Sequence, residues 1–323
     1  MNFAKLALKN GGVIKSLLIN FQDLSGPSLM NPSVLVVDGK ILVNIRNVNY
    51  TLYHSELNRF EHMWGPLSYI HPENDMHLRT TNYIAELNDD LDIIQYTKID
   101  TSQFDNYKPQ WDFVGLEDCR LVEWENKLYL CGVRRDLDTK GTGRMELSEI
   151  VINGSTVKEV SRYRIPGPPP DTEYCMKNCT PILDKPFHLL KWTNPTALMK
   201  FDISGKETEI FEYSSPKLET DLRGGSQVIP YKNGYLSVLH ETNLYTSEQG
   251  KKNATYRHRF VVWNKDFKLQ KVSKLFSFLN MKIEFCCGMC EYKNDYLITF
   301  GAQDNAAYIM KISKSLVENF INE

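Results

Sequence analysis

The stretch SVLVVDGKILVNIR, residues 33–46, contains the pattern that decides the fold. Two runs of mostly apolar residues flank Asp38-Gly39, a pair that favours a tight turn between antiparallel strands. Four further segments repeat this order of strand, polar turn and strand: RLVEWENKLYLCGVR (120–134), TPILDKPFHLLKWT (180–193), SQVIPYKNGYLSVLHE (226–241) and GMCEYKNDYLITFGA (288–302). Their turns are predicted at Glu125-Asn126, Asp184-Lys185-Pro186, Lys232-Asn233-Gly234 and Lys293-Asn294-Asp295.

These hairpins are spread over the whole chain, which predicts an array of small antiparallel sheets. Radial repetition around an axis arranges such sheets without long exposed edges, so the pattern favours a β-propeller. A β-sandwich and a two-domain β protein are the alternatives that the pattern leaves open.

The composition is typical of a soluble globular protein. The chain has 323 residues, of which 42% are hydrophobic and 24% charged, and this length is ample for a substantial core. A formal net charge of −2 gives no electrostatic reason to expect a nucleic acid or an anionic membrane as partner. No apolar run approaches the roughly 20 residues that span a bilayer. Lys5, Lys9 and Lys15 interrupt the apolar N-terminal stretch, so no signal peptide is predicted.

The seven cysteines raise the question of a metal site. An odd count without secretory context favours reduced thiols and a cytoplasmic location. Cys287 and Cys290 form a CxxC pair, and Cys175 and Cys179 are spaced CxxxC. A structural zinc site commonly uses two well-spaced pairs, whereas these pairs lie far apart in strand-like apolar sequence. We expect them to be small buried residues, and we predict no metal site.

A polar or glycine-rich signature precedes each hairpin. The signatures are NPS (31–33), GLED (115–118), KN (177–178), RGG (223–225) and IEFCCG (283–288). In a propeller, the innermost strand of each blade lines the central channel, so equivalent positions of successive blades converge at one mouth. The signatures are therefore expected to face one common cavity.

With these motifs, the chain resembles glycoside hydrolase family 130, the five-bladed propeller family of β-mannoside phosphorylases and mannosidases, and the related mannosyltransferases of that fold. The resemblance covers roughly residues 25–312 and rests on NPSVLVVDGKILVNIRNVNY, GLEDCRL, KNCTP, RGGSQVIP with VLHE, and IEFCCGM with ITFGAQDNAA. It implies an all-β, five-bladed β-propeller. The expected organisation is one catalytic domain over residues 1–323, with segments 1–25 and 313–323 packing on the propeller or closing it.

Two positions depart from the family pattern. Cys119 stands where the family usually has Pro, and Met176-Lys177-Asn178-Cys179 stands where it usually has Glu-Lys-Asn-Trp. The second change removes an acid and an aromatic surface from near the expected pocket.

The resemblance nominates Asp118 as the catalytic acid. Making or cleaving a glycosidic bond requires a proton transfer at the bridging oxygen, usually from a side chain whose pKa is tuned toward neutral pH. In the phosphorylases of this family, a single Asp serves and passes its proton through a sugar hydroxyl. The neighbouring Glu117 and Asp112 would raise the pKa of Asp118, and Arg120 would lower it. Successive strand residues point to opposite faces, so only one of Glu117 and Asp118 is expected to reach the channel, and the favoured partner of Glu117 is Arg120.

A phosphorolytic enzyme uses inorganic phosphate as nucleophile, so it needs a cationic cradle and no second carboxylate. The candidates for binding phosphate or a phosphorylated donor are Arg46, Arg134, Arg135, Lys177 and His240. Only one of Arg134 and Arg135 can face inward on a strand. The candidates for binding substrate are Asn47, Asp112, Glu117, Asn178, Arg223, Glu284 and Asp304.

The predicted function is transfer of a glycosyl group with inversion, β-mannosyl by the resemblance, with inorganic phosphate as co-substrate and no other cofactor. The expected partners are an oligosaccharide or a sugar phosphate, with a homo-oligomer as a further possibility. A glycosyltransferase with a nucleotide-sugar or sugar-phosphate donor would use the same cations. A β-mannoside hydrolase would need a carboxylate base for water. The remaining alternative is a carbohydrate-binding propeller, against which Asp118 and the basic set argue.

Overall fold

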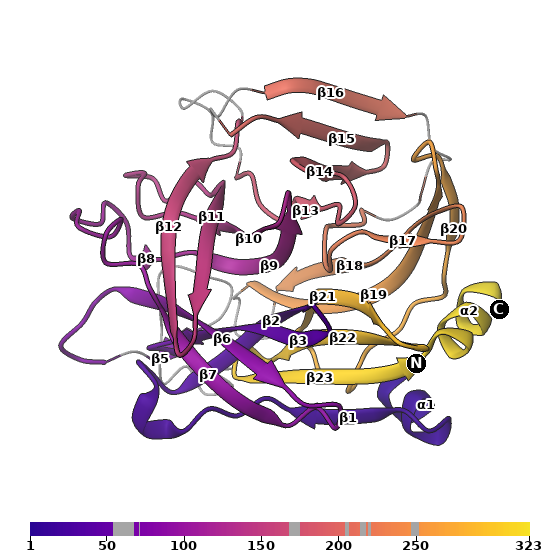
Figure 1. Cartoon of the computed structure of the whole chain (residues 1–323), viewed down its shortest axis with the longest axis horizontal. Coiled ribbons are helices and arrows are strands. Elements are labelled where there is room, and N and C mark those ends of the chain that lie inside the picture. The colour runs from indigo at the N-terminus through magenta and orange to yellow at the C-terminus, as the bar shows by residue number, and fades with distance from the viewer. Residues whose placement is uncertain are drawn as a thin grey trace.

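The computed structural model describes residues 1–53, 68–70, 72–167, 175–203, 207–213, 218, 221–246 and 252–323. Strands dominate and form five blades of four strands each (Figure 1). The first blade contains β2 (Ser28–Val37), β3 (Lys40–Val48), β6 (Leu78–Leu87) and β7 (Ile93–Asp100). The second contains β9 (Glu117–Trp124), β10 (Lys127–Arg134), β11 (Arg144–Asn153) and β12 (Thr156–Arg164).

The third blade contains β13 (Thr180–Pro181), β14 (His188–Thr193), β15 (Thr196–Phe201) and β16 (Glu207–Tyr213). The fourth contains β17 (Ile229–Tyr231), β18 (Gly234–Thr246), β19 (Lys252–Asn264) and β20 (Leu269–Val272). The fifth contains β21 (Glu284–Tyr292), β22 (Asp295–Ala302), β23 (Ala306–Ser313) and, as its outermost strand, β1 (Val13–Ser16). The smaller elements are η1 (Phe21–Asp23), β4 (Thr51–Tyr53), β5 (Ser68–Ile70) and β8 (Phe113–Val114).

The five predicted hairpins are the two innermost strands of the five blades. Their turns contain residues with positive φ, among them Asp38 at +50° and Lys293 at +53°, as expected for tight connections between antiparallel strands. The predicted fold class, an all-β five-bladed propeller, is confirmed. Neighbouring blades lie side by side around one centre, and β2 of the first blade packs against β21 of the fifth. The first two blades are also joined at their outer strands, where β7 and β12 pair in parallel.

The last blade is completed by the N-terminal part of the chain. Strand β1 pairs antiparallel with β23, so residues near the two ends share one sheet. Helices α1 (Phe3–Lys9) and α2 (Lys314–Asn322) lie beside it, at the right of Figure 1. Phe3 is buried against Phe260, Phe276 and Phe320, with ring centroids 4.7 to 5.5 Å apart. Among the described helices, none is long and apolar enough to span a membrane.

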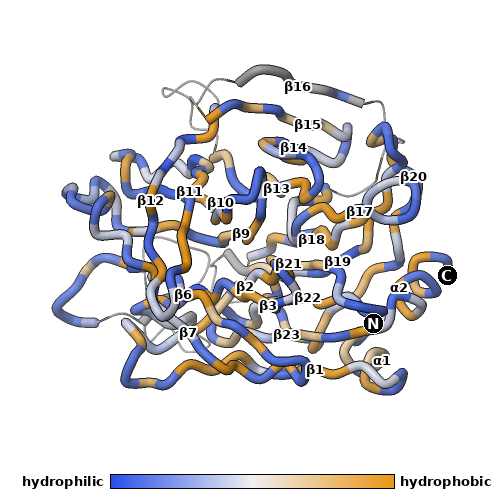
Figure 2. The backbone as a smooth tube through the Cα atoms, viewed as in Figure 1, coloured by the Kyte–Doolittle hydropathy of each residue, from blue (hydrophilic) through white to orange (hydrophobic). Residues whose placement is uncertain are grey.

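Apolar side chains fill the space between blades, and polar side chains form hydrogen bonds between strands at the centre of the ring. Figure 2 shows hydrophobic stretches along the strands and hydrophilic turns at the periphery. At the centre, the buried Gln227 donates to the carbonyl oxygens of Val34 (3.0 Å) and Leu121 (2.8 Å) and accepts from the Met289 amide (2.9 Å). One side chain thus ties together β2, β9 and β21. Asn31, Asp118 and Phe285 stand on these three strands, so this network fixes their relative positions.

Six of the seven cysteines are buried, and Cys175 is half-buried. Burial raises the pKa of Cys131, Cys179 and Cys287 to about 12, so these thiols stay protonated at neutral pH. Across the described ranges, no group of three or more His, Cys, Asp and Glu side chains is arranged to hold a metal ion.

Candidate active site

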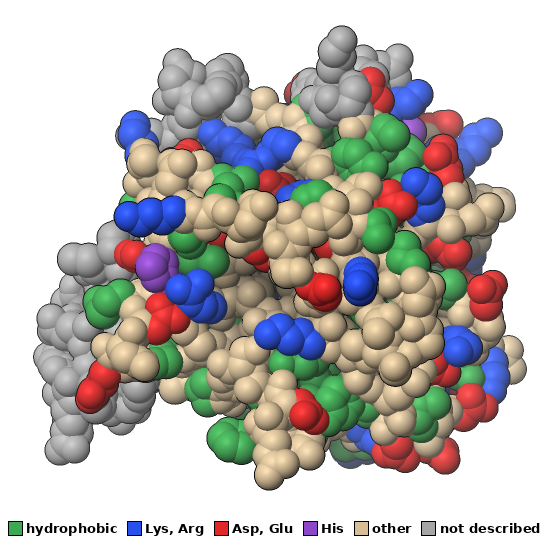
Figure 3. All heavy atoms as spheres, turned by 60° about the vertical axis from the view of Figure 1, so that its left-hand side comes forward, with side chains coloured by type: hydrophobic (Ala, Val, Ile, Leu, Met, Phe, Trp, Pro, Cys, Tyr) green, Lys and Arg blue, Asp and Glu red, His purple; other side chains and the backbone are tan. Residues whose placement is uncertain are grey.

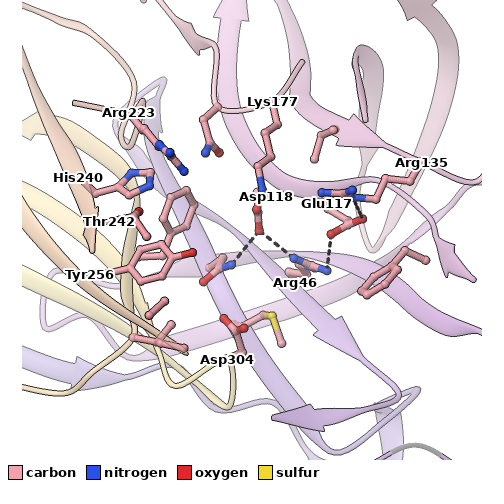
Figure 4. Close-up of a pocket in the computed structure, with 18 of the residues that line it drawn as sticks. Arg46, Glu117, Asp118, Arg135, Lys177, Arg223, His240, Thr242, Tyr256 and Asp304 are labelled. Carbon is pink, nitrogen blue, oxygen red and sulfur yellow. Dashed lines mark hydrogen bonds and ion pairs between the residues drawn. The ribbon is translucent and has the colours of Figure 1, made fainter. Parts of the chain in front are cut away.

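A pocket of about 450 Å³ opens at one mouth of the propeller (Figure 4). Each of the five polar signatures contributes to its lining, through Asn31, Asp118, Lys177, Arg223 and Phe285. The prediction that the signatures meet at one cavity is therefore confirmed. The described residues that line it are Met30, Asn31, Arg46, Tyr50, Phe113, Glu117, Asp118, Val133, Arg135, Lys177, Asn178, Arg223, His240, Thr242, Leu244, Ala254, Tyr256, Ile283, Phe285 and Asp304.

Asp118 lies in the middle of this pocket. Its Oδ1 accepts hydrogen bonds from Asn31 Nδ2 (2.7 Å) and Arg46 Nη1 (2.8 Å), and its side chain keeps 20% of its surface exposed. Burial raises the pKa of Asp118, but Arg46, Arg120, the Asn31 hydrogen bond and Lys177 together hold it below its ordinary value. In the free protein, Asp118 is thus a carboxylate at neutral pH, and not the acid tuned toward neutrality that the sequence suggested.

Both Glu117 and Asp118 line the pocket, so the prediction that only one would reach it is wrong. Asp118 has a left-handed backbone, with φ of +51°, and the pairing of β9 with β10 shifts register between Cys131 and Val133. A bulge of this kind breaks the alternation of side chains along a strand. Two consecutive carboxylates therefore face the same cavity.

The predicted pairing of Glu117 with Arg120 is also wrong. Glu117 instead contacts Arg46 (Oε2 to Nη2, 3.1 Å) and Arg135 (Oε1 to Nε, 3.4 Å). Arg120 is fully buried and donates to two backbone carbonyls, those of Asp118 (Nη1, 2.7 Å) and Gly225 (Nε, 2.9 Å). It therefore joins the second and fourth blades and supports the backbone that carries Asp118.

Arg46 comes from β3 and is almost fully engaged. Besides the two carboxylates, it donates to Tyr50 Oη (2.9 Å) and to Thr80 Oγ1 (3.1 Å). A guanidinium has five N–H groups, and four of them have these partners. The geometry assigns Arg46 mainly to the orientation of Asp118 and Glu117.

Three further cations line the pocket around Asp118. Arg135 lies 5.9 Å from the centroid of the Phe113 ring and donates to the Gly141 carbonyl (3.3 Å). Lys177 extends toward Asp118 in Figure 4, and in the described part of the chain its ammonium makes no ion pair. Arg223 pairs with the exposed Asp221 (3.1 Å).

His240 also lines the pocket but is not a cation at neutral pH. Burial, followed by the charges of Arg223, Arg120 and Lys177, lowers its pKa to about 3. Its buried Nδ1 has no hydrogen-bond partner among the described residues. The neutral ring stacks on Tyr256, with ring centroids 5.4 Å apart.

Asp304 differs from the other carboxylates of the pocket. Burial, followed by the negative charges of Asp118 and Glu117 acting against Arg46, raises its pKa to about 6. No hydrogen bond to its carboxyl group is found in the described ranges. Its backbone is left-handed, with φ of +50°. Asp304 thus faces the cavity with its hydrogen-bonding capacity open to a ligand.

Four predicted site residues lie outside the pocket, and each makes contacts that stabilise the fold. Arg134 points away from Arg135, as strand alternation requires, and binds Glu146 (2.8 Å) and Tyr107 Oη (2.7 Å). Asn47 donates to the carbonyl oxygens of Gly26 and Ser28, both at 2.9 Å.

The other two residues outside the pocket are acids. Glu284 accepts from the amides of Phe278 (2.6 Å), Leu279 (2.8 Å) and Met281 (2.8 Å), so it caps a loop. Asp112 lies beside β8, where its backbone carbonyl accepts from the Leu78 amide (2.7 Å). The prediction that these four residues line the pocket is wrong. A polar residue near a signature can equally well form hydrogen bonds that stabilise the backbone.

The sequence interpretation missed several lining residues. Asn31 is the first residue of the NPS signature, and this position was a signal that could have identified it as a lining residue. Its backbone has a positive φ of +43°. Thr242 and Tyr256 lie on the long β18–β19 hairpin and face the pocket from the same side as His240 in Figure 4. No local pattern marks them, because their role depends on how far that hairpin extends.

Surface charge is mixed on one face of the molecule. On the face shown in Figure 3, Lys and Arg side chains alternate with Asp and Glu, and no large area of a single sign is visible. This face offers no extended basic surface for a nucleic acid backbone.

No protein-family model and no curated protein matches the chain, but solved structures do. The Listeria innocua β-1,2-mannobiose phosphorylase, in complex with β-1,2-mannobiose, aligns over 95% of both chains, with 11% identity and a TM-score of 0.56. A mannose phosphorylase from Leishmania mexicana, in complex with phosphate ion, aligns over 98% of this chain and 93% of the other, with 13% identity and a TM-score of 0.52.

A third similar structure comes from work on the GH130 family of mannoside phosphorylases and on its glycoside hydrolases that target β-1,2 mannosidic linkages in Candida mannan. It aligns over 94% of both chains, with 12% identity and a TM-score of 0.59. At such identities, the likeness concerns the course of the chain and not its activity. The chain therefore has the five-bladed propeller fold found among the mannoside phosphorylases and hydrolases of the GH130 family.

Proposed function

We propose that the protein is an inverting glycoside phosphorylase, whose single catalytic domain transfers a β-mannosyl group between a sugar and phosphate. One observation carries the proposal: Asp118 shares its pocket with Arg135, Lys177 and Arg223. Inorganic phosphate is already a nucleophile, and what it needs from a protein is cationic donors beside the reacting carbon. The similarity of fold to mannoside phosphorylases supports the choice of sugar.

The charge state of Asp118 suggests how the reaction runs in each direction. In synthesis, the acceptor hydroxyl loses its proton to the Asp118 carboxylate through a sugar hydroxyl, its oxygen bonds to the anomeric carbon, and phosphate leaves. In phosphorolysis, the bond between the anomeric carbon and the bridging oxygen breaks, that oxygen receives the proton, and a phosphate oxygen attacks from the opposite face. Phosphate bound beside Lys177 would offset the cations that depress the Asp118 pKa, which prepares Asp118 to hold that proton.

A β-mannoside hydrolase is the second candidate, and Asp304 is the observation that favours it. An inverting hydrolase needs a carboxylate that removes a proton from the attacking water. Asp304 faces the cavity, and with a pKa of about 6 it is largely ionised at neutral pH. The cations around Asp118 have no role in such a reaction, so we place this candidate second.

The experiment offers the protein mannose 1-phosphate, or a nucleotide mannose, with a panel of acceptor sugars, and then β-linked mannobioses with and without inorganic phosphate. Product formation from mannose 1-phosphate, together with phosphate-dependent release of mannose 1-phosphate from a mannobiose, supports the proposal. Turnover with the nucleotide donor alone identifies a glycosyltransferase. Free mannose released without phosphate identifies a hydrolase.

A further inference from the structure

A second, smaller cavity opens into the surface beside the candidate active site. It has a volume of about 250 Å³ and is lined by Cys175, Lys177, Asn178, Lys191, Trp192, Asp221, Leu222, Arg223 and Gly224. Lys177, Asn178 and Arg223 also line the main pocket, so the two cavities adjoin each other. We call the smaller cavity the side groove.

The wall between the two cavities is made by closely packed backbone. A Cβ atom on Gly224 would lie 1.8 Å from the Asn178 carbonyl oxygen, so only glycine fits at this position. Asn178 itself has a left-handed backbone, with φ of +60°. These two residues bring the connection before β13 and the segment before β17 into contact, which joins the third and fourth blades at this point.

The side groove contains more positive than negative charge. Among the described residues that line it, three side chains are cations, and the one carboxylate, Asp221, is bound to Arg223 at 3.1 Å. Neither Lys177 nor Lys191 forms an ion pair with any described residue. Lys177 extends toward Asp118 in the main pocket, so the ammonium of Lys191 is the charge that favours an anionic ligand in the groove.

A β-bulge brings both Lys191 and Trp192 into the groove. The pairing of β14 with β15 shifts register between Leu190 and Trp192, which leaves Lys191 as the extra residue. Such a bulge changes the direction of side chains that would otherwise alternate. Trp192 keeps 42% of its surface exposed, although indole rings are usually largely buried. The exposed part of this indole borders the cavity and adds apolar surface to it.

We propose that the side groove binds the acceptor sugar and selects an acceptor that carries a phosphate group. This inference rests on the proposed function, because it requires the donor and the phosphate co-substrate to occupy the main pocket. The sugar ring would lie on the Trp192 indole, and its phosphate would accept hydrogen bonds from Lys191. The groove volume lies below the range of about 300–1,000 Å³ typical of drug-sized ligands, which suits a single sugar unit.

Calorimetry tests the binding step without turnover. Asp118→Asn protein is titrated with mannose and with mannose 6-phosphate, in inorganic phosphate high enough to occupy the main pocket. We expect mannose 6-phosphate to bind about tenfold more tightly than mannose, a difference of about 1.4 kcal/mol. Adding Lys191→Glu should remove this preference, and adding Trp192→Ala should weaken binding of both sugars. Lys265→Glu, on the exposed turn after β19, is the matched control and should preserve the preference.

Three results would overturn the inference. The first is loss of mannose 6-phosphate binding in inorganic phosphate, which would place its phosphate in the main pocket. The second is an unchanged preference in Lys191→Glu. The third is tighter, Lys191-dependent binding of a nucleoside diphosphate, which would assign the groove to a nucleotide donor.

Transfer kinetics separate this inference from the proposed function. With mannose 1-phosphate as donor, the ratio of kcat/KM for phosphorylated over neutral acceptors should fall about tenfold in Lys191→Glu. Efficient transfer to neutral acceptors, with no gain from an acceptor phosphate, would overturn the inference and leave the proposed function standing. Absence of transfer to every acceptor, with Lys191-dependent binding intact, would overturn the proposed function and the acceptor role but leave a sugar-phosphate site.

Discussion

At the scale of single residues, the pocket is a set of carboxylates in different charge environments. Cations and a hydrogen bond lower the pKa of Asp118 below its usual value. Burial and neighbouring carboxylates raise the pKa of Asp304 to about 6. Glu117 is occupied by Arg46 and Arg135. Groups whose environments separate their pKa values are able to play different parts in proton transfer.

Replacement of Asp118 by Asn tests its part in the chemistry. The amide keeps the shape but cannot exchange a proton, so we expect kcat for transfer to fall by at least a factor of about 10². Circular dichroism should show an unchanged fold. Full activity in this variant, measured as phosphate released from mannose 1-phosphate, would exclude Asp118 as the proton-transferring residue.

Replacement of Asp304 by Asn tests its raised pKa through stability. The folded protein holds this proton up to a pH of about 6, whereas an unfolded Asp releases it near its ordinary value of 3.8. Ionised Asp304 is therefore a cost to the folded state that grows as the pH rises from about 4 to 6. We expect Asp304→Asn to raise the free energy of unfolding by about 1–3 kcal/mol at pH 7.5, and by less at pH 5.

Urea unfolding at several pH values measures this difference. Asp221→Asn, at an exposed carboxylate, is the control and should show no such trend. An Asp304→Asn protein whose advantage does not grow with pH would mean that Asp304 titrates as an ordinary, solvated carboxylate.

At the scale of elements, two β-bulges decide which side chains enter the cavities. One lies opposite Gly132 and turns both Glu117 and Asp118 into the main pocket, and the other lies at Lys191 in β14. A Cβ atom on Gly132 would lie 2.7 Å from the Glu117 carbonyl oxygen and 2.9 Å from Leu116 Cγ. The close approach of the two strands at this bulge therefore requires glycine.

Gly132→Ala tests whether this bulge positions the catalytic carboxylate. The added methyl group must push β9 away from β10, so we expect a loss of about 1–3 kcal/mol in unfolding free energy and a clear fall in kcat. Gly154→Ala, on the turn between β11 and β12, adds a methyl group that meets no atom within 4 Å. Its positive φ should cost about 1 kcal/mol without a change in kcat. Equal kcat in both variants would contradict the positioning role.

At the scale of the whole molecule, the ring is closed by pairing of segments from the two ends of the chain. Strand β1 completes the fifth blade, and helices α1 and α2 cover the same region. Phe3 is the central contact of this closure, because its buried ring packs against one ring from α2 and two from the fourth blade side.

Phe3→Ala should therefore destabilise the whole propeller. Removing a fully buried ring leaves a cavity, and we expect a loss of about 3–5 kcal/mol in unfolding free energy together with a lower Tm. Phe21→Ala is the matched control, because that ring is 78% exposed and its loss should change stability by less than about 0.5 kcal/mol. Similar losses in both variants would show that the closure contributes nothing particular to stability.

The hairpins and their turns were predictable because they depend on neighbouring residues. An apolar strand, a polar turn and a second strand are all visible within about 15 residues, and the five turns occur where the pattern placed them. The regular position of a polar signature before each hairpin also predicted a shared cavity, and each signature contributes a residue to its lining.

The partners of the site residues were not predictable in this way. Asp118 binds Arg46, which lies 72 residues away in sequence, and the pairing of Glu117 with Arg120 failed because Arg120 turns to two backbone carbonyls. Strand alternation correctly predicted that only one of Arg134 and Arg135 would line the pocket. It did not predict which of the two would do so. The sequence by itself determined the blades, since their signals are local. Only the tertiary structure decided the bulges, the ion pairs and the pKa values, because these depend on distances between blades that no local pattern contains.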